Sequence, residues 1–174
     1  METTEIPGLV KITNFNQFDS RGLFVKSLNS QNLKELDFNL QESFFSVSRK
    51  DVLRGMHFQL PPFDQNKIIF VSSGKILDVI LDLRLDSPTY GHHEVFEISK
   101  ETNYSLYIPL GLAHGFYSLE DNSIVNYLVS SPYSPDHDKG ILYNSFGFNW
   151  NYVNPIISKR DLSFPSFNEF KSVF

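Results

Sequence analysis

Short apolar or alternating runs, each bounded by turn residues, limit the fold of this chain more than any other feature. The runs at Leu23–Leu28, Phe44–Ser48 and Ile76–Arg84 have the length and alternation of β-strands. Seventeen Phe, eight Tyr, nine Pro and nine Gly among 174 residues favour short strands joined by turns over long helices. About ten such runs predict an all-β sandwich or barrel, and we expect a double-sheet jelly roll with short peripheral helices.

The same patterns predict several local structures. Asn16–Gly22 is expected to form a turn, and Ser30 is expected to cap a short helix, because Leu33 and Leu36 follow at a helical spacing. Ser72–Lys75 has a length and composition suited to a hairpin. Near the end of the chain, a short amphipathic helix is predicted from three aromatic residues: Phe167, Phe170 and Phe174.

Length, charge and cysteine content restrict the class of protein. A chain of 174 residues fits one domain, which we expect to span 1–174. Cysteine is absent, which excludes disulfides and thiolate chemistry and agrees with a reducing compartment. The net charge of -5 leaves no basic surface for nucleic acid. Because no signal-like start or bilayer-spanning apolar run is present, we expect a soluble, cytoplasmic protein with no membrane partner.

The stretch Val52–Gln59 is the strongest candidate for chemistry. Alternation along a strand places His57 and Gln59 on one face and Met56 and Phe58 on the other. The first face would point into a cavity while the second packs. A lone histidine in a β protein is more often a hydrogen-bonded core residue than a catalytic one, so His57 needs partners before it indicates a site.

A metal site is the first hypothesis to weigh. The sequence Pro109-x-Gly111-x-x-His114 is similar to the second motif of the cupins, jelly-roll proteins that hold a metal with a His-x-His pair, a Glu and a further His. In this chain Gln59 stands where the second histidine of the pair would be, and no glutamate follows at the right place. These donors disfavour a transition metal, although a metal-dependent cupin stays open as an alternative.

The remaining polar residues suit acid–base chemistry on an anionic carbonyl compound. Arginine forks match phosphate oxygens, and a lysine can polarise a carbonyl. A histidine made basic by a carboxylate can remove a proton beside that carbonyl, and a tyrosine on the opposite face can return one. Asp78 and Asp82, which share a strand face, are instead expected to face solvent. The inventory would serve epimerisation of a nucleotide-linked keto sugar, and it comprises Arg21, Arg54, Lys67, His57, His114, Tyr127, Asp78, Asp82 and Asp161.

Ordered motifs between about residue 8 and about residue 161 give the chain a family resemblance. It resembles the dTDP-4-dehydrorhamnose 3,5-epimerase family, a metal-free branch of the cupins. Each motif alone is weak evidence, but together and in family order they are strong. The matching segments are Asp19–Phe24, Val52–Gln59, Gln65–Lys67, Gly74–Arg84, Ser87–Gly91, Ile108–Phe116, Tyr127 and Tyr133–Pro135.

The resemblance implies catalytic roles for four residues. His57 would be the general base, paired with Asp161. Tyr127 would be the acid on the opposite face of the sugar. Lys67 would lie near the C4 carbonyl, where a cation stabilises the enolate that forms when the neighbouring proton leaves. No cofactor is implied.

The resemblance also implies a substrate-binding set and a dimer. Arg21, Arg54 and His114 would serve the substrate and its pyrophosphate, and Tyr133 and Phe18 would stack on the base. The family works as a homodimer with strand exchange near the N-terminus, so Arg21 would act in the partner's site. The rest of the expected set supports the polar network or contacts the nucleotide sugar: Asp78, Gln59, Glu42 and Lys26.

Three departures from the family pattern fall in the expected substrate-contact set, besides Tyr143 where a tryptophan is common. Lys26 stands where a glutamate is usual, and Glu42 and Phe44 stand where Gln and Asn are common. These positions usually contact the nucleotide or the sugar, so the reaction type is better supported than the substrate. A single-centre epimerase, an enzyme for another nucleotide sugar, and a non-catalytic nucleotide-sugar-binding cupin remain as alternatives.

Overall fold

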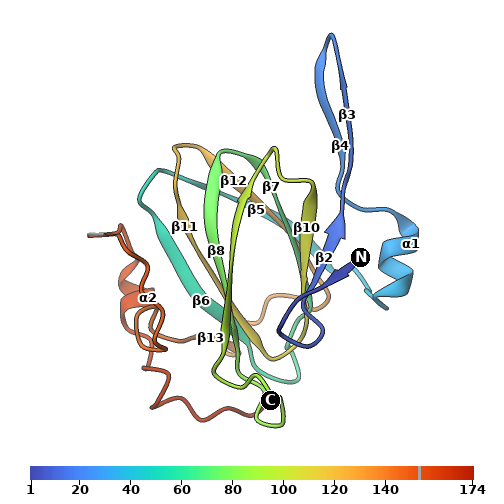
Figure 1. Cartoon of the computed structure of the whole chain (residues 1–174). Helices are drawn as coiled ribbons and strands as arrows, with labels where there is room; N and C mark the ends of the chain where they lie inside the picture. Colours follow the sequence, from blue (N-terminus) through green and yellow to red (C-terminus); the bar gives the residue numbers. More distant parts are fainter. Residues whose placement is uncertain (153) are drawn as a thin grey trace.

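In the computed structural model, which describes residues 1–152 and 154–174, two antiparallel β-sheets face each other and make up most of the molecule (Figure 1). The first sheet runs in the order β1 (Glu2–Thr3), β2 (Val10–Thr13), β10 (Tyr104–Ile108), β7 (Lys67–Ser73), β12 (Ser123–Val129) and β5 (Glu42–Ser48). The second runs in the order β13 (Asp138–Gly140), β6 (Leu53–Gln59), β11 (Leu112–Ser118), β8 (Lys75–Asp82) and β9 (His93–Ser99). Two short helices are peripheral, α1 (Ser30–Glu35) and α2 (Lys159–Leu162). The predicted all-β jelly roll of the cupin type is confirmed.

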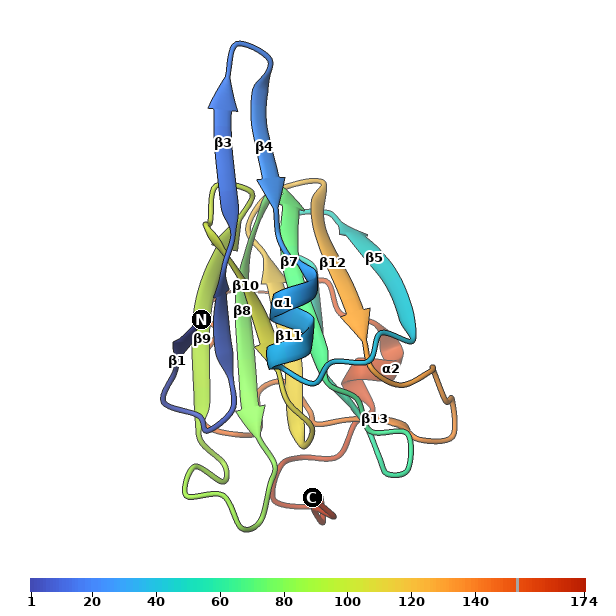
Figure 2. The same cartoon turned by 90° about the vertical axis from the view of Figure 1, so that its right-hand side faces the viewer.

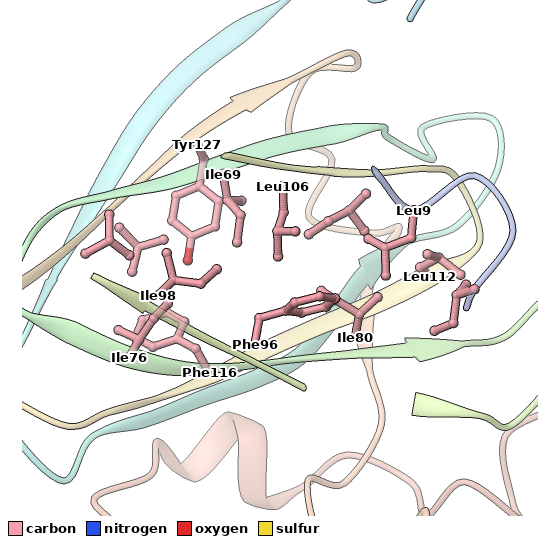
Figure 3. Packing of buried hydrophobic residues seen from close by; sticks show 14 residues of the cluster. Leu9, Ile69, Ile76, Ile80, Phe96, Ile98, Leu106, Leu112, Phe116 and Tyr127 are labelled. Carbon is pink, nitrogen blue, oxygen red and sulfur yellow. The ribbon is translucent and has the colours of Figure 1, made fainter. Parts of the chain in front are cut away.

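The main core lies between the two sheets (Figure 3). Inward side chains such as Ile69 and Val125 from the first sheet meet Ile80 and Phe116 from the second. This follows from the period-2 alternation, which turns every second side chain of a strand toward the facing sheet.

Both outer faces are partly covered. Met56, Val79 and Tyr117 on the outer face of the second sheet pack against the C-terminal segment. On the first sheet, α1 packs through Leu33 and through Leu36 at its C-cap (Figure 2). The second sheet is therefore buried on both sides over much of its area. No helix in the described part of the chain is long and apolar enough to cross a membrane.

The predicted hairpin at Ser72–Lys75 is wrong. The connection passes from β7 in one sheet to β8 in the other, with Gly74 at φ +69°. Both strands bury an apolar face in the same core from opposite sides, so they cannot lie side by side. Their neighbours are instead β10 and β12 for the first strand, and β11 and β9 for the second.

The predicted turn over Asn16–Gly22 is mostly a strand. β3 (Phe15–Asp19) pairs with β4 (Gly22–Lys26) in a hairpin that projects beyond the two sheets (Figures 1 and 2). Its residues are largely exposed, including Phe18 at 73%, so no inward apolar face signals a strand in the sequence.

The two predicted helices also need correction. The N-cap of α1 is Asn29 rather than Ser30, because the Asn29 side chain accepts a hydrogen bond from the Asn32 N–H in a capping box. The three C-terminal phenylalanines do not lie on a helix. Phe167 lies in a turn, in which the Phe170 N–H donates to the Ser166 carbonyl, and the Phe174 carbonyl accepts from the Leu85 N–H. All three rings pack on the outer face of the second sheet.

Candidate active site

Side chains from both sheets line a cavity of about 300 Å³. The second sheet contributes residues from β6 and β11, and the first contributes residues from β5, β7 and β12. A ligand in the cavity would therefore be approached from two opposite sides. The predicted site residues that line it are Arg54, His57, Gln59, Lys67, His114, Tyr127 and Tyr133.

His57 is bonded to a buried carboxylate at the cavity wall. Its Nε2 lies 3.0 Å from Oδ1 of Asp161. Asp161 belongs to α2, and its N–H donates to the hydroxyl of the N-cap residue Ser158. The other Asp161 oxygen accepts from the Gly55 N–H at 3.1 Å. Burial by itself would raise the pKa of Asp161, but the bonds from His57, Gly55 and Ser158 outweigh it and hold that pKa below its usual range. The ionised carboxylate engages one ring nitrogen and leaves the other to act as a base.

The segment that carries Asp161 is held against the cavity by further contacts. Arg160 makes an ion pair with Asp138 at 2.7 Å, and its guanidinium lies 5.1 Å from the centre of the Phe164 ring. That ring and the His57 ring lie nearly perpendicular to each other, with 5.6 Å between ring centroids. A side chain at Gly140 would collide with Phe164, so this close approach requires a glycine. These contacts fix α2 and thereby the partner of His57.

A second histidine–carboxylate pair lies deeper in the cavity. His114 Nε2 is 2.6 Å from Oδ1 of Asp78, and both side chains are buried. The other Asp78 oxygen has no hydrogen-bond partner among the described residues. The expectation that Asp78 and Asp82 face solvent is wrong: both are fully buried, because each face of β8 is covered. The Asp82 carboxylate instead accepts hydrogen bonds from the Arg84 guanidinium and from the hydroxyls of Ser87 and Thr89.

Lys67 places a cationic group in the same space. Its Nζ donates to the His57 carbonyl at 3.2 Å, and its side chain is almost completely buried. Burial lowers the pKa of Lys67 to about 8, although the Asp138 and Asp78 carboxylates partly oppose the change. The amine is charged at neutral pH and is weakly hydrated, which suits stabilisation of a developing oxyanion.

Tyr127 lies on the opposite side of the cavity from His57. Figure 3 shows its ring pointing between the sheets. Burial, with the nearby Asp78 carboxylate as a smaller contribution, raises the pKa of Tyr127. The phenol therefore keeps its proton at neutral pH and can act as a donor.

Gln59 and Glu42 hold loops at the cavity. The Gln59 amide donates to the carbonyls of Phe63 and Pro132, at 2.6 and 3.1 Å, and accepts from the Ser134 N–H at 2.8 Å. Glu42 does not line the cavity, but its Oε1 accepts from the Tyr133 N–H at 3.2 Å. Both side chains thus order the loop that carries Tyr133.

Three predicted substrate-binding residues lie away from this cavity. Phe18, Arg21 and Lys26 belong to the β3–β4 hairpin, which projects from the body of the molecule (Figure 1). Arg21 is highly exposed and pairs with Asp19 of the same hairpin at 2.6 Å. Their assignment to a substrate site stays a prediction.

The sequence interpretation missed several cavity residues. Ser46 lines the cavity together with Phe44, which the sequence singled out only as a departure from the family pattern. Alternation along this strand could have placed both on the inner face. Asp138 also lines it, in a three-residue strand too short to leave a periodic signal. No sequence pattern indicated Arg160 and Phe164, because their contacts with the cavity residues depend on where α2 packs in the folded chain.

The cavity residues do not fit a metal centre. Among residues 1–152 and 154–174, no group of three or more His, Asp and Glu side chains is arranged to hold a metal ion. His57 and His114 are each bonded to a separate carboxylate, Asp161 and Asp78. Two separate histidine–carboxylate pairs suit proton transfer better than metal coordination.

Fold and cavity together define a cupin-type jelly roll equipped for acid–base chemistry. The family model of dTDP-4-dehydrorhamnose 3,5-epimerase matches residues 3–169, so the chain belongs to this family. It is 36% identical to the dTDP-4-dehydrorhamnose 3,5-epimerase of Mycolicibacterium smegmatis over 168 residues, 94% of this chain and 84% of the relative.

Solved structures agree with this assignment. The dTDP-6-deoxy-D-glucose-3,5-epimerase of Legionella pneumophila, in complex with dTDP-4-keto-L-rhamnose, is similar with a TM-score of 0.91 and 31% identity, over 98% of this chain and 93% of that one. A 3'-monoepimerase from Streptomyces bikiniensis in complex with dTDP-quinovose gives a TM-score of 0.89 and 29% identity, over 95% and 87%. The likeness therefore includes a single-centre enzyme.

Proposed function

We propose that the chain is an isomerase that acts as a dTDP-4-dehydro-6-deoxyglucose 3,5-epimerase in dTDP-rhamnose biosynthesis, and so supplies deoxysugar for polysaccharide. The observation that carries this proposal is the placement of His57 and Tyr127 on opposite sheets across one cavity. Inversion at carbon requires a proton to leave from one face and another to arrive at the opposite face. A cytoplasmic location stays a prediction, supported by the absence of cysteine.

The reaction would proceed through an enolate. His57, oriented by Asp161, takes the proton from a carbon beside the C4 ketone, and the C–H electrons move onto the ketone oxygen. The Lys67 ammonium stabilises that oxyanion. Tyr127 then donates its proton to the opposite face of the carbon, and solvent exchange restores both residues. The same steps at the second carbon beside the ketone complete a 3,5-epimerisation.

The nucleotide would occupy the open side of the cavity. Arg54 lines the cavity, and its guanidinium is oriented by the Ser48 hydroxyl at 3.1 Å, which supports a role in binding the pyrophosphate. Tyr133 offers an exposed ring at the same opening, suited to stacking on a base. The relatives solved with dTDP sugars support a dTDP-linked substrate.

Solvent deuterium incorporation tests the reaction. The protein is incubated with dTDP-4-dehydro-6-deoxyglucose in D₂O, and label at C3 and C5 is followed by NMR. A 3,5-epimerase labels both carbons and inverts both. Label at one carbon would indicate the single-centre alternative, the activity named for the similar 3'-monoepimerase. Nucleotide binding without any label would indicate a non-catalytic cupin.

We also propose that the working unit is a homodimer. Apolar rings are exposed on the hairpin at Phe15 and Phe24 and on the outward face of β5 at Phe45. A hollow of about 290 Å³ lies between the base of the hairpin and β7, lined in part by Val25 and Phe70. A second copy that covers this surface would bury the exposed rings and could receive the hairpin beside its own cavity.

A further inference from the structure

We propose that Phe44 is a positioning residue for the proton donor and holds the Tyr127 ring where it can reach the second face of the sugar. The inference rests on the proposed function, in which Tyr127 is the acid. It concerns how that acid is kept in place, and it predicts a specific failure when Phe44 is removed.

Phe44 and Tyr127 face each other directly across two strands. They are register partners in the β5–β12 pair, and both side chains line the cavity. Their ring centroids are 4.8 Å apart and the ring planes differ by 16°. This is the stacked arrangement and spacing that aromatic pairs prefer. The contact therefore restrains the tilt of the Tyr127 ring.

A second ring restrains Tyr127 from another direction. The His114 and Tyr127 ring centroids are 5.9 Å apart, with the planes inclined by 63°. His114 is itself fixed by its 2.6 Å bond to Asp78. The Tyr127 ring thus contacts His114, which is fixed in the interior, and Phe44, which is not.

Phe44 is the adjustable partner. It is 48% exposed and belongs to β5, the edge strand of its sheet. Because half of the ring meets solvent, removing it costs the fold less than removing a core residue. Its removal leaves the Tyr127 ring open toward the mouth of the cavity, where the ring can tilt away from the reacting carbon.

A tilted donor changes the outcome of the enolate rather than its formation. His57 still removes the proton, because the His57–Asp161 bond does not involve Phe44. The His57 side chain is 30% exposed, so its new proton exchanges with solvent. When Tyr127 is out of reach, the enolate takes a proton back from His57 on the original face. The product of this return is unconverted substrate that carries solvent hydrogen.

The test compares exchange with inversion in D₂O for Phe44→Leu, using dTDP-4-dehydro-6-deoxyglucose. We expect deuterium to enter recovered substrate at the wild-type rate or faster, while inversion slows about tenfold, since a misplaced acid loses part of the factor that acid catalysis supplies. The ratio of exchange to inversion then rises about tenfold, and KM changes less than about threefold. Phe44→Tyr keeps the ring and should keep the wild-type ratio.

Tyr152→Leu is the matched control. Tyr152 is 36% exposed and stacks on Tyr117, with ring centroids 3.8 Å apart, but neither ring lines the cavity. This variant should leave the ratio unchanged. An unchanged ratio in Phe44→Leu and in the second variant Phe44→Met would overturn the proposal, even if both turn over more slowly. Wild-type protein that shows neither exchange nor inversion would contradict the proposed function instead.

Discussion

His57 and His114 are register partners on the neighbouring strands β6 and β11, and each is bonded to its own carboxylate. Their exposure differs, because the His57 side chain is 30% exposed and the His114 side chain only 4%. The exposed histidine can exchange protons with a ligand and solvent, whereas the buried one is held in place. The two similar pairs therefore differ in their access to a ligand, and in the proposed mechanism the carboxylate of the first should control turnover.

Asp161→Asn tests that control. Asparagine has the size of aspartate and can still accept from the Gly55 N–H, so we expect the fold to remain intact. It lacks the negative charge that faces His57 and would stabilise the proton taken up there, so turnover should fall about 10²- to 10⁴-fold. The measurement is kcat together with the thermal unfolding midpoint. Unchanged turnover would remove Asp161 from the catalytic pair.

The pH dependence of catalysis should reveal Lys67. Its pKa is lowered to about 8, so the amine loses its charge as pH rises through that value. We expect kcat/KM to fall above about pH 8, near the Lys67 pKa, rather than near the usual lysine value of 10.5. In Lys67→Arg the cation persists at alkaline pH, so any residual activity should no longer show this decline. A decline at the same pH in both proteins would assign it to another group.

Lys67 should also reduce the stability of the fold. Burial of its charged form is unfavourable, so we expect Lys67→Met to raise the free energy of unfolding at pH 7 by about 1–3 kcal/mol while it abolishes turnover. The unfolded chain binds more protons than the folded chain between about pH 8 and 10.5, so wild-type stability should rise with pH in that window. Urea unfolding at pH 7 and pH 9.5 measures both effects. A less stable methionine variant would be inconsistent with a costly buried charge.

Alternation was sufficient to predict the strands that face the core and the inward direction of His57. It could not predict which strands become neighbours, since the residues at 72–75 suit a hairpin as well as a crossing between sheets. It also could not predict the burial of Asp78, which depends on the C-terminal segment covering the far face of β8.

Contacts between residues far apart in the chain are the part of the site that local sequence could not predict. The partner of His57 lies 104 residues away in a four-residue helix, and no local pattern connects the two. Family resemblance implied this pair, whereas the stacking of Phe44 on Tyr127 required the register of β5 against β12. Local sequence thus predicts which way a side chain points but not what it meets.

Subunit complementation tests whether the hairpin serves a neighbouring cavity. Arg21 lies on the projecting hairpin and His57 in the cavity, so in the proposed dimer one site combines His57 of one copy with Arg21 of the other. His57→Ala and Arg21→Ala homodimers should both be nearly inactive. After unfolding and refolding as an equal mixture, half of the dimers are mixed, and each mixed dimer has one site with both residues intact. We therefore expect recovery of about a quarter of the wild-type kcat per subunit. Separately refolded homodimers are the control. No recovery in the mixture would place Arg21 in the site of its own chain, and an active Arg21→Ala homodimer would place it outside the site altogether.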